Sequence, residues 1–453
     1  MPPLARRDVR SMIRKLGAHA RPSQQKQALE TIAGLSNCGG DRDSLVAIAA
    51  AGAVPPLVQL LGAGSSSDVQ CNAIAALDNL ACLAENQVAI AAAGAIPALV
   101  QLLESSFSPL VGNAAGALQN LSENADNQAT IAAAGAISPL VQLLGPGSTA
   151  QVQHYAAGAM RNLACLGANH VTIAAAGAIP LLVQLLGPVA SAKVQQSAAG
   201  ALRNLARNAD NQVAIAIADA GAIPLLVQLL GPGSSVEVQQ SAAGALINLS
   251  QNADLKVAIA SAGAVPPLVQ LLGPVASAEV QQSAAGAIIN LAQNNDNRVI
   301  IAAAGAIPPL VQLLGPSATD EEQKSAAGAI MNLADHSKNQ ATIAAACAIP
   351  PVVQLLRARS PADVQKNAAG ALCNLAKNAH NRVTIAAAGA IPPLVLLLRS
   401  GSDDLPKEFA AAALEELGDN NAKNRAAIAA AGASAGVDVL KEMERLCIYD
   451  DDE

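Results

Sequence analysis

Aromatic residues are nearly absent from this chain. Among its 453 residues there is no tryptophan, and there are only two tyrosines and two phenylalanines, although hydrophobic residues make up 52% of the total. Alanine, leucine, isoleucine and valine therefore have to supply the core. Such small side chains let helices approach each other closely, which favours stacked helices over a thick globular centre.

Charged residues are also scarce, at 13% of the chain, and the net charge of −7 lies in the second half. Residues 1–230 carry 12 basic and 12 acidic groups, whereas residues 231–453 carry 15 and 22. A negative net charge disfavours nonspecific nucleic-acid binding, which needs a basic field to displace counterions. We also expect no membrane span, because a proline or glycine interrupts every apolar run within about a dozen residues.

The motifs of metal and nucleotide sites are missing as well. The seven cysteines form no C-x-x-C pair and are odd in number, which is typical of reduced thiols and predicts a cytoplasmic or nuclear protein. The histidines are scattered, with no cysteine or acid at metal-ligand spacing, and no G-x-x-x-x-G-K-[ST] sequence occurs. We therefore predict a protein that is not an enzyme and has no catalytic residue, metal site or cofactor.

What the chain has in abundance is repetition. A glycine returns mostly every 42 residues within the phrase AAAGAIPPLVQLLGP, and Cys347 fills the single gap in the series. The recurring glycines are Gly52, Gly94, Gly135, Gly177, Gly221, Gly263, Gly305, Gly389 and Gly432. Such a period predicts modules that cannot bury their apolar faces alone, so that stacked modules share one core and form a solenoid.

Residues 209–250 show the pattern of one module. Asp210 is expected to cap a short first helix, which stops at Gly221 because a residue without Cβ adopts the left-handed conformation readily. Pro224 then opens a second helix. A glycine-proline-glycine break and a capping serine precede a third helix over about residues 236–250. The pattern therefore predicts three helices per module.

The third helix has two distinct faces when its residues are placed at about 100° intervals. In the preceding module the face expected to meet the core holds Val194, Ala198, Ala201, Leu202 and Leu205. The opposite side holds Lys193, Gln196, Ser197, Gly200, Arg203, Asn204 and Arg207. Asparagine recurs at the slot of Asn204, although it is a mediocre helix former. This slot contains Asn79, Asn120, Asn162, Asn204, Asn248, Asn290, Asn332 and Asn374.

The period and the phrases GAIPPLVQLL and AAGALRNLA resemble the armadillo repeat, from about Arg7 to Leu446. Similar near-identical repeats occur in plant, algal and protist armadillo proteins and in the yeast vacuolar armadillo adaptor. The resemblance implies an all-α fold, a right-handed α–α superhelix with three helices per repeat of about 42 residues. The predicted organisation is a capping half-repeat at 1–41, nine repeats at 42–417, a closing partial repeat at 418–446 and an acidic tail at 447–453. The arginine-rich start is also typical of an organelle transit peptide.

The resemblance also implies a function. In armadillo proteins the third helices line a concave groove, and an asparagine at this slot binds the main chain of an extended peptide. The eight asparagines would thus make the chain a noncatalytic adaptor, monomeric and bound to an extended segment of a partner protein. A carboxamide suits that task because it offers both a donor and an acceptor to any peptide unit. The alternative is that these asparagines only tie neighbouring helices together.

Two other functions remain open. The chain could be a structural component of a large cytoskeletal or axonemal assembly, using its convex or end surfaces. A weaker alternative is an importin-α-like nuclear transport adaptor. Such adaptors carry tryptophan one turn before the asparagine, where this chain has Ala75 and then only glycines, from Gly116 to Gly370. Plant armadillo proteins often carry a U-box for ubiquitin transfer, for which the residues before Gly52 leave no room.

The slot just before each asparagine varies while its neighbours hardly change. It holds Asp78, Gln119, Arg161, Arg203, Ile247, Ile289, Met331, Cys373 and Glu415. The arginines, together with His154, Tyr155 and Arg207, predict a basic stretch that leads into an apolar strip. We therefore predict a partner segment that is acidic at one end and apolar further along. Its binding residues would be Tyr155, Arg161, Arg203, Arg207, Ile247, Ile289 and Met331. Drift of exposed slots after duplication is the alternative explanation.

Overall fold

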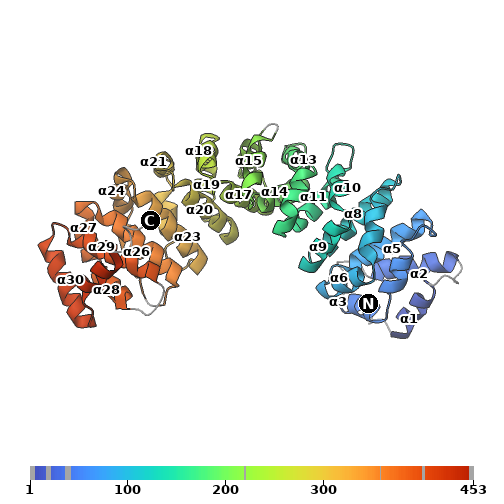
Figure 1. Ribbon diagram of the computed structural model, residues 1–453, viewed down its shortest axis with the longest axis horizontal. Coiled ribbons are helices and arrows are strands. Elements are labelled where there is room, and N and C mark those ends of the chain that lie inside the picture. Colours follow the sequence, from blue (N-terminus) through green and yellow to red (C-terminus); the bar gives the residue numbers. More distant parts are fainter. Residues whose placement is uncertain are drawn as a thin grey trace. The chain divides into compact units, whose positions relative to one another are not determined.

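The computed structural model describes residues 6–16, 22–35, 42–218, 221–357, 359–399 and 404–447. These residues form helices and no β-strand, which confirms the predicted all-α class. Their contacts group the chain into two compact units, Met1–Leu226 and Val227–Glu453, with the boundary inside α16 (Ala222–Leu229). Figure 1 shows the helices, and each unit is described by itself.

In unit 1, two helices precede the repeating order of first, second and third helices. These two are α1 (Arg6–Arg14) and α2 (Pro22–Leu35). The first helices are α3 (Arg42–Ala50), α6 (Ala84–Ala92), α9 (Ala125–Ala133), α12 (His170–Ala175), which follows the 3₁₀ turn η1 (Gly167–Asn169), and α15 (Ala209–Ile217). The second helices are α4 (Val54–Gln59), α7 (Ala95–Leu102), α10 (Ile137–Gln142) and α13 (Ala178–Gln184). The third helices are α5 (Ser67–Leu80), α8 (Ser108–Leu121), α11 (Ala150–Leu163) and α14 (Ala192–Leu205).

Unit 2 continues the same order and ends differently. Its third helices are α17 (Val236–Leu249), α20 (Ala278–Leu291), α23 (Asp320–Ala334), α26 (Ala362–Ala376) and α29 (Asp404–Gly418). The first helices are α18 (Ala253–Ser261), α21 (Asn295–Ala303), α24 (Ser337–Ala345), α27 (Ala379–Ala387) and α30 (Ala422–Ala435). The second helices are α19 (Val265–Gln270), α22 (Ile307–Gln312), α25 (Ile349–Gln354) and α28 (Ile391–Arg399), and α31 (Val439–Cys447) is the last helix.

The third helices of each unit pack against one another in chain order, and this row forms the spine of the stack. In unit 2, Figure 1 shows α20, α23 and α26 along one edge and α18, α21 and α24 along the other. The predicted solenoid of three-helix modules is therefore confirmed within each unit. The domain boundaries remain a prediction, and residues 448–453 of the predicted acidic tail lie outside the described residues.

The helix α14 illustrates how the predicted faces compare with the structure. Val194, Ala198, Ala201, Leu202 and Leu205 are all fully buried, as expected. On the opposite side, however, Ser197, Gly200 and Asn204 are buried as well. The structure buries these three residues because a neighbouring third helix, α11, packs against α14 from the side.

The corner glycines adopt the left-handed conformation that the sequence predicted. Eight of them have φ between 77° and 88°, and Cys347 has φ of 59°. The prediction fails at Gly432, which lies inside α30; that helix ends instead at Gly436, whose φ is 64°. Asp210 was also misplaced as a cap. Asn208 caps α15, and its side chain accepts a hydrogen bond from the backbone N–H of Asn211.

Among the described residues, the cysteines differ from the prediction at Cys82. Cys71, Cys165, Cys347 and Cys373 are free thiols, whereas Cys82 takes part in a disulfide bond. The expectation that all seven are reduced is therefore wrong at Cys82. The missing C-x-x-C spacing does not exclude a bond between cysteines that are distant in sequence.

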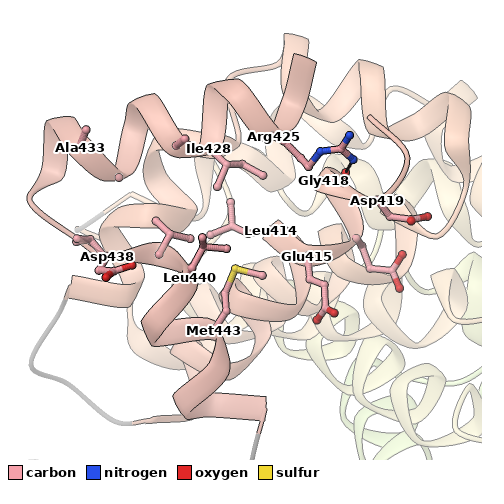
Figure 2. Close-up of a pocket in the computed structure, with 15 residues that line it drawn as sticks. Leu414, Glu415, Gly418, Asp419, Arg425, Ile428, Ala433, Asp438, Leu440 and Met443 are labelled. Carbon is pink, nitrogen blue, oxygen red and sulfur yellow. Dashed lines mark hydrogen bonds between the residues drawn. The ribbon is translucent and has the colours of Figure 1, made fainter. Parts of the chain in front are cut away.

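The end of unit 2 is less completely packed than its other layers. A cavity of about 860 Å³ opens between α29, α30 and α31 (Figure 2). Asn421 caps α30, but of the residues in that helix only Asn424 and Gly432 are buried.

Across the described residues, no single helix combines the length and apolar composition that a membrane crossing requires; two bent helix pairs meet those criteria only when taken together.

The cost of the left-handed corner can be tested at Cys347. Cys347→Gly should stabilise the protein by about 1 kcal/mol, because glycine avoids the Cβ–carbonyl clash. The reverse change at an equivalent corner, Gly305→Ala, should destabilise it by about the same amount, since a Cβ there meets no other atom and only the backbone is strained. Urea unfolding followed by circular dichroism measures both. Equal midpoints for wild type and Cys347→Gly would contradict this account.

Candidate functional site

The asparagine side chains at the slot of Asn204 form a regular set of hydrogen bonds between neighbouring layers. Each Nδ2 donates to a backbone carbonyl of the preceding third helix, or of α2 in the case of Asn79. The donor–acceptor distances are 3.1 Å from Asn79 to Ala33, 3.4 Å from Asn120 to Asp78, 3.0 Å from Asn162 to Gln119, 2.8 Å from Asn204 to Arg161, 3.0 Å from Asn290 to Ile247, 2.9 Å from Asn332 to Ile289 and 3.0 Å from Asn374 to Met331. Asn248 lies at the same slot of α17. The tie between helices that the sequence left as an alternative therefore exists along this slot in both units.

These ties use only part of each carboxamide. Asn290, Asn332 and Asn374 each donate one hydrogen bond through Nδ2 and remain partly exposed. A carboxamide has two N–H donors and an acceptor oxygen, so a second donor and Oδ1 remain available at all three. The backbone bond holds the amide in one orientation while leaving these groups for another molecule.

The residue before each asparagine does not project freely from the helix. A Cβ added to Gly158 would lie 2.7 Å from Gln119 Cδ, and one added to Gly370 would lie 2.5 Å from Met331 Sδ. Ile247 and Ile289 lie over the next glycines in the same way. Four of the variable side chains thus rest on the bare glycine of the following third helix, at the slot where importin-type adaptors carry tryptophan: Gln119, Ile247, Ile289 and Met331. Gln119 fits so tightly that its Oε1 is buried without a hydrogen bond.

The predicted basic stretch lies on α11, on α14 and just after α14. Arg161 and Arg203 are half-buried and Arg207 is exposed. Arg161 Nε donates to Asn162 Oδ1 at 3.3 Å, and neither Arg161 nor Arg207 forms an ion pair with a described carboxylate. Tyr155 lies 3.4 Å from the place of a Cβ on Gly116, so its ring covers α8.

His154 contributes little positive charge to this stretch. Burial lowers the pKa of its imidazole, and the nearby charges of Lys193 and Arg161 act in the same direction. Its Nδ1 lies 3.2 Å from the carbonyl oxygen of Lys193 and 3.1 Å from Ser197 Oγ. The histidine therefore ties α11 to α14, and the charge of the stretch comes from the arginines.

Two members of the variable slot have strongly shifted pKa values. Burial raises the pKa of Asp78 to about 6, although Asn120 donates a hydrogen bond of 2.8 Å to its Oδ1. Burial likewise raises the pKa of the Cys373 thiol to about 11, which keeps it protonated and weakly nucleophilic. The Cys373 thiol is therefore not a candidate nucleophile at neutral pH.

A second row of asparagines was missed by the sequence reasoning. In the first helices, Asn297 Nδ2 donates to Leu291 O at 3.2 Å and to Lys256 O at 3.1 Å. Asn339 and Asn381 form the same pair of hydrogen bonds. The related phrases at the start of the first helices, such as NADNQ at residues 124–128 and 208–212, were the available signal. These buried amides satisfy carbonyls at the ends of the third helices.

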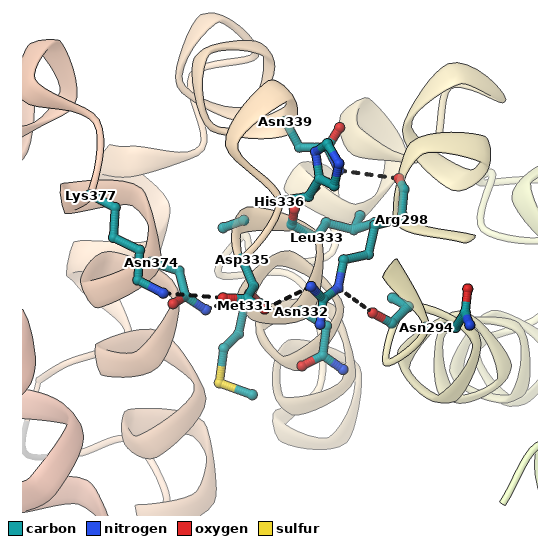
Figure 3. Close-up of polar contacts among 12 residues, drawn as sticks. Asn294, Arg298, Met331, Asn332, Leu333, Asp335, His336, Asn339, Asn374 and Lys377 are labelled. Atoms are coloured by element: carbon teal, nitrogen blue, oxygen red, sulfur yellow. Dashed lines mark hydrogen bonds and ion pairs between the residues drawn. The ribbon is translucent and has the colours of Figure 1, made fainter. Parts of the chain in front are cut away.

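An ion-pair chain adds to these contacts in unit 2. Arg298 lies 2.7 Å and Lys377 3.1 Å from the two carboxylate oxygens of Asp335, as Figure 3 shows. Burial opposes ionisation of Asp335, but Lys377 and Arg298 outweigh it and lower the pKa of the carboxyl. The three charges connect α21, the C-terminal end of α23 and the end of α26.

The described residues show no catalytic or metal-binding cluster. They contain no group of three or more His, Cys, Asp or Glu side chains placed to hold a metal ion. Residues 432–436 do match the G-x-S-x-G pattern of a nucleophile elbow. That elbow is a strand-to-helix turn, whereas Ser434 lies in the last turns of α30 and donates to Ala430 O at 2.9 Å.

The raised pKa of Asp78 leads to a pH-dependent prediction. Because the folded pKa lies above the unfolded value of about 4, the folded state loses stability as pH rises from 4 to 6 and carries a constant penalty above that. Asp78→Asn keeps an acceptor for Asn120 and removes the penalty. It should be neutral near pH 4 and stabilising by up to about 3 kcal/mol at pH 7.5. Urea midpoints across this range measure the difference, and a pH-independent difference would refute the assignment.

Comparison with known proteins agrees with this geometry. Residues 150–420 match the family model for the plant U-box protein ARM repeat region, and residues 42–82, 84–123 and 124–165 match the armadillo/β-catenin-like repeat. No curated protein matched the chain.

Solved structures include two similar proteins. The crystal structure of an engineered protein from a structural genomics consortium is 35% identical, covers 91% of this chain and 99% of its own, and has a TM-score of 0.81. A designed armadillo repeat protein is 31% identical over 53% of this chain and 99% of its own, with a TM-score of 0.49. With more than half of its length matched by one family model, the chain belongs to the armadillo-repeat family.

Proposed function

We propose that this chain is a noncatalytic scaffold that binds an extended segment of a partner protein across its third helices. The observation that carries the proposal is the half-used carboxamide of Asn290, Asn332 and Asn374. Each amide is fixed by its bond to the preceding helix, and each keeps a donor and an acceptor for a peptide unit. An amide fixed in advance loses little conformational entropy when it binds.

The surroundings support an extended main chain as the ligand. Because the slot before the asparagine is variable and the asparagine is constant, the constant group suits the invariant part of a peptide. An extended chain rises about 3.3 Å per residue, and helices pack about 8–10 Å apart. One layer would then correspond to two or three residues of the partner.

The variable slot supplies the specificity in this proposal. In unit 1, Arg161, Arg203 and Arg207 favour an acidic segment, and Tyr155 offers a ring edge beside them. In unit 2, Ile247, Ile289 and Met331 favour apolar side chains. The proposed partner thus carries an acidic stretch for unit 1 and an apolar stretch for unit 2.

A structural role in a larger assembly is the second candidate, and one observation favours it. A valine in the first helices is exposed in several layers, at 51% for Val88, 65% for Val171 and 61% for Val383. Exposed apolar residues that recur at one slot are typical of a contact surface. This role would use the first helices and would not require the asparagine slot.

The main proposal is tested with peptides selected against the wild-type protein by display. The triple variant Asn290→Ala/Asn332→Ala/Asn374→Ala should weaken their binding at least tenfold, because three main-chain contacts are lost. Fluorescence anisotropy measures the dissociation constants.

The matched control removes three equivalent ties from the first helices of the same region. Asn297→Ala/Asn339→Ala/Asn381→Ala also breaks bonds between layers, and it should lower stability while leaving the affinity within about twofold. Equal loss of affinity in both variants would show that the asparagines of the third helices act only on stability. Unchanged binding by the first variant would favour assembly through other surfaces.

The charge preference is tested separately in unit 1. Arg161→Glu/Arg203→Glu should weaken an acidic peptide about tenfold at low salt, with a smaller effect at high salt because screening reduces the attraction. Lys26→Glu/Arg42→Glu changes the net charge equally at other exposed sites and should leave the affinity nearly unchanged. Identical affinities for wild type and the arginine variant at low salt would rule out the proposed polarity.

A further inference from the structure

The last layer of unit 2 contains the cavity of about 860 Å³ introduced above, which the groove proposal does not use. In Figure 2, Leu414, Ile428, Leu440 and Met443 face one another between α29, α30 and α31. Leu414 forms its floor and is 1% exposed, whereas Leu440 is 74% exposed at its mouth. The volume lies in the range of ordinary ligand pockets.

This cavity exists because the final layer lacks the second helix that follows a corner glycine elsewhere. An isoleucine recurs at one slot of the preceding first helices and is fully buried in all nine of them, from Ile48 to Ile385. Its equivalent in α30 is Ile428, which is only half-buried. At Gly432 the chain continues as helix, and α31 approaches so closely that a Cβ there would lie 2.8 Å from Val439 Cγ2. The apolar surface that a second helix would cover therefore stays open.

Acidic residues surround this apolar surface. Glu415, Glu416, Asp419 and Asp438 line the cavity, and Arg425 is the one basic residue among the lining side chains. Arg425 is already engaged, since its Nη1 donates to Gly418 O at 2.9 Å. Arg382 lies 3.7 Å from Glu416 and 2.9 Å from Asp419, which partly neutralises these two carboxylates.

The charge of the whole chain is concentrated at this end. The residues before Asp404 carry 22 basic and 22 acidic groups, whereas those from Asp404 onwards carry 5 and 12. The entire net charge of −7 thus belongs to the last 50 residues. The carboxylates that line the cavity would attract a cationic partner over about a Debye length.

We propose that this cavity is a second docking site, which takes a segment of a partner protein with large apolar side chains next to lysine or arginine. The apolar side chains would complete the unfilled layer, and the basic groups would meet the carboxylates at its rim. The complementary charge also argues against the chain's own last residues as the occupant, because Asp450–Glu453 would be repelled. The site is independent of the asparagine slot.

A pair of synthetic helical peptides tests the proposal with the full-length protein. One peptide has leucine on one face and lysine on the other, and its counterpart carries glutamate in place of every lysine. The lysine peptide should bind at least tenfold more tightly at low salt, and the difference should shrink as salt is added. Equal binding of both peptides would overturn the proposal.

Two variants locate the binding in the cavity. Leu440→Asn should weaken the lysine peptide about tenfold, since it removes apolar contact from an exposed position that folding does not need. Its control is Leu396→Asn, an exposed leucine on α28 that does not line the cavity. Glu415→Lys should lower the affinity for the lysine peptide at low salt. Glu408→Lys, on the same helix but away from the cavity, should leave that affinity unchanged. Unchanged affinity in Leu440→Asn would exclude the cavity as the site.

Two further measurements decide between this partner and other occupants. Sedimentation analysis should show a monomer in both wild type and Leu440→Asn; a dimer that Leu440→Asn dissolves would assign the cavity to a second copy and refute the proposal. Deletion of residues 448–453 removes four carboxylates, so at low salt it should weaken binding of the lysine peptide modestly and should not strengthen it. A tenfold gain on deletion would assign the cavity to the chain's own tail. Neither result depends on the asparagine variants, so the two proposals can fail separately.

Discussion

The close approach of neighbouring third helices is the constraint on which the rest of each unit depends. It is accompanied from the second layer on by glycine one turn before the asparagine, which leaves room for the side chain of Gln119 beside Gly158 and of Met331 beside Gly370. It also brings each asparagine amide within hydrogen-bond distance of the preceding helix. Alanine fills most of the remaining contact, which explains how a chain with almost no aromatic residues can bury its core. Dispersion between many small, closely packed groups replaces the large contacts of aromatic rings.

Close packing creates a polar problem that the repeats solve with side-chain amides. Each third helix ends with carbonyls that have no partner inside the helix, and the buried asparagines of the first helices bond to them. At the other end, glutamines such as Gln281 donate to carbonyls just after the second helix, at 3.3 Å to Leu272 and 2.7 Å to Gly273. Unpaired, each of these buried groups would cost on the order of 1–3 kcal/mol. The amides therefore hold the layers in register as well as satisfying the backbone.

Sequence periodicity predicted the fold well because the constraint repeats. The recurring glycine marked the left-handed corners. The helical periodicity of the apolar residues located the third helices to within a residue or two, as at Val236–Leu249. It failed where the repeat is imperfect or where neighbours decide. Gly432 matches the corner pattern, but without the following proline-rich helix the chain continues as α30. Ser197 and Gly200 have the position of exposed residues on an isolated helix, and only the adjacent layer buries them.

The candidate site could be predicted from the sequence only in part. The asparagine slot was visible as a constant residue, but the sequence could not show that its amide is divided between a backbone tie and a free donor and acceptor. Nor could it show that the variable residue beside it packs on the next layer. The consequence is that specificity and stability are coupled along the stack. A larger residue in place of Ile247 or Ile289 would alter what a ligand meets and would also press on Gly286 or Gly328. Selection for a new partner would therefore be restricted to side chains that the next glycine can accommodate. Among the described residues no third helix follows α29, so Glu415 at its variable slot escapes this restriction.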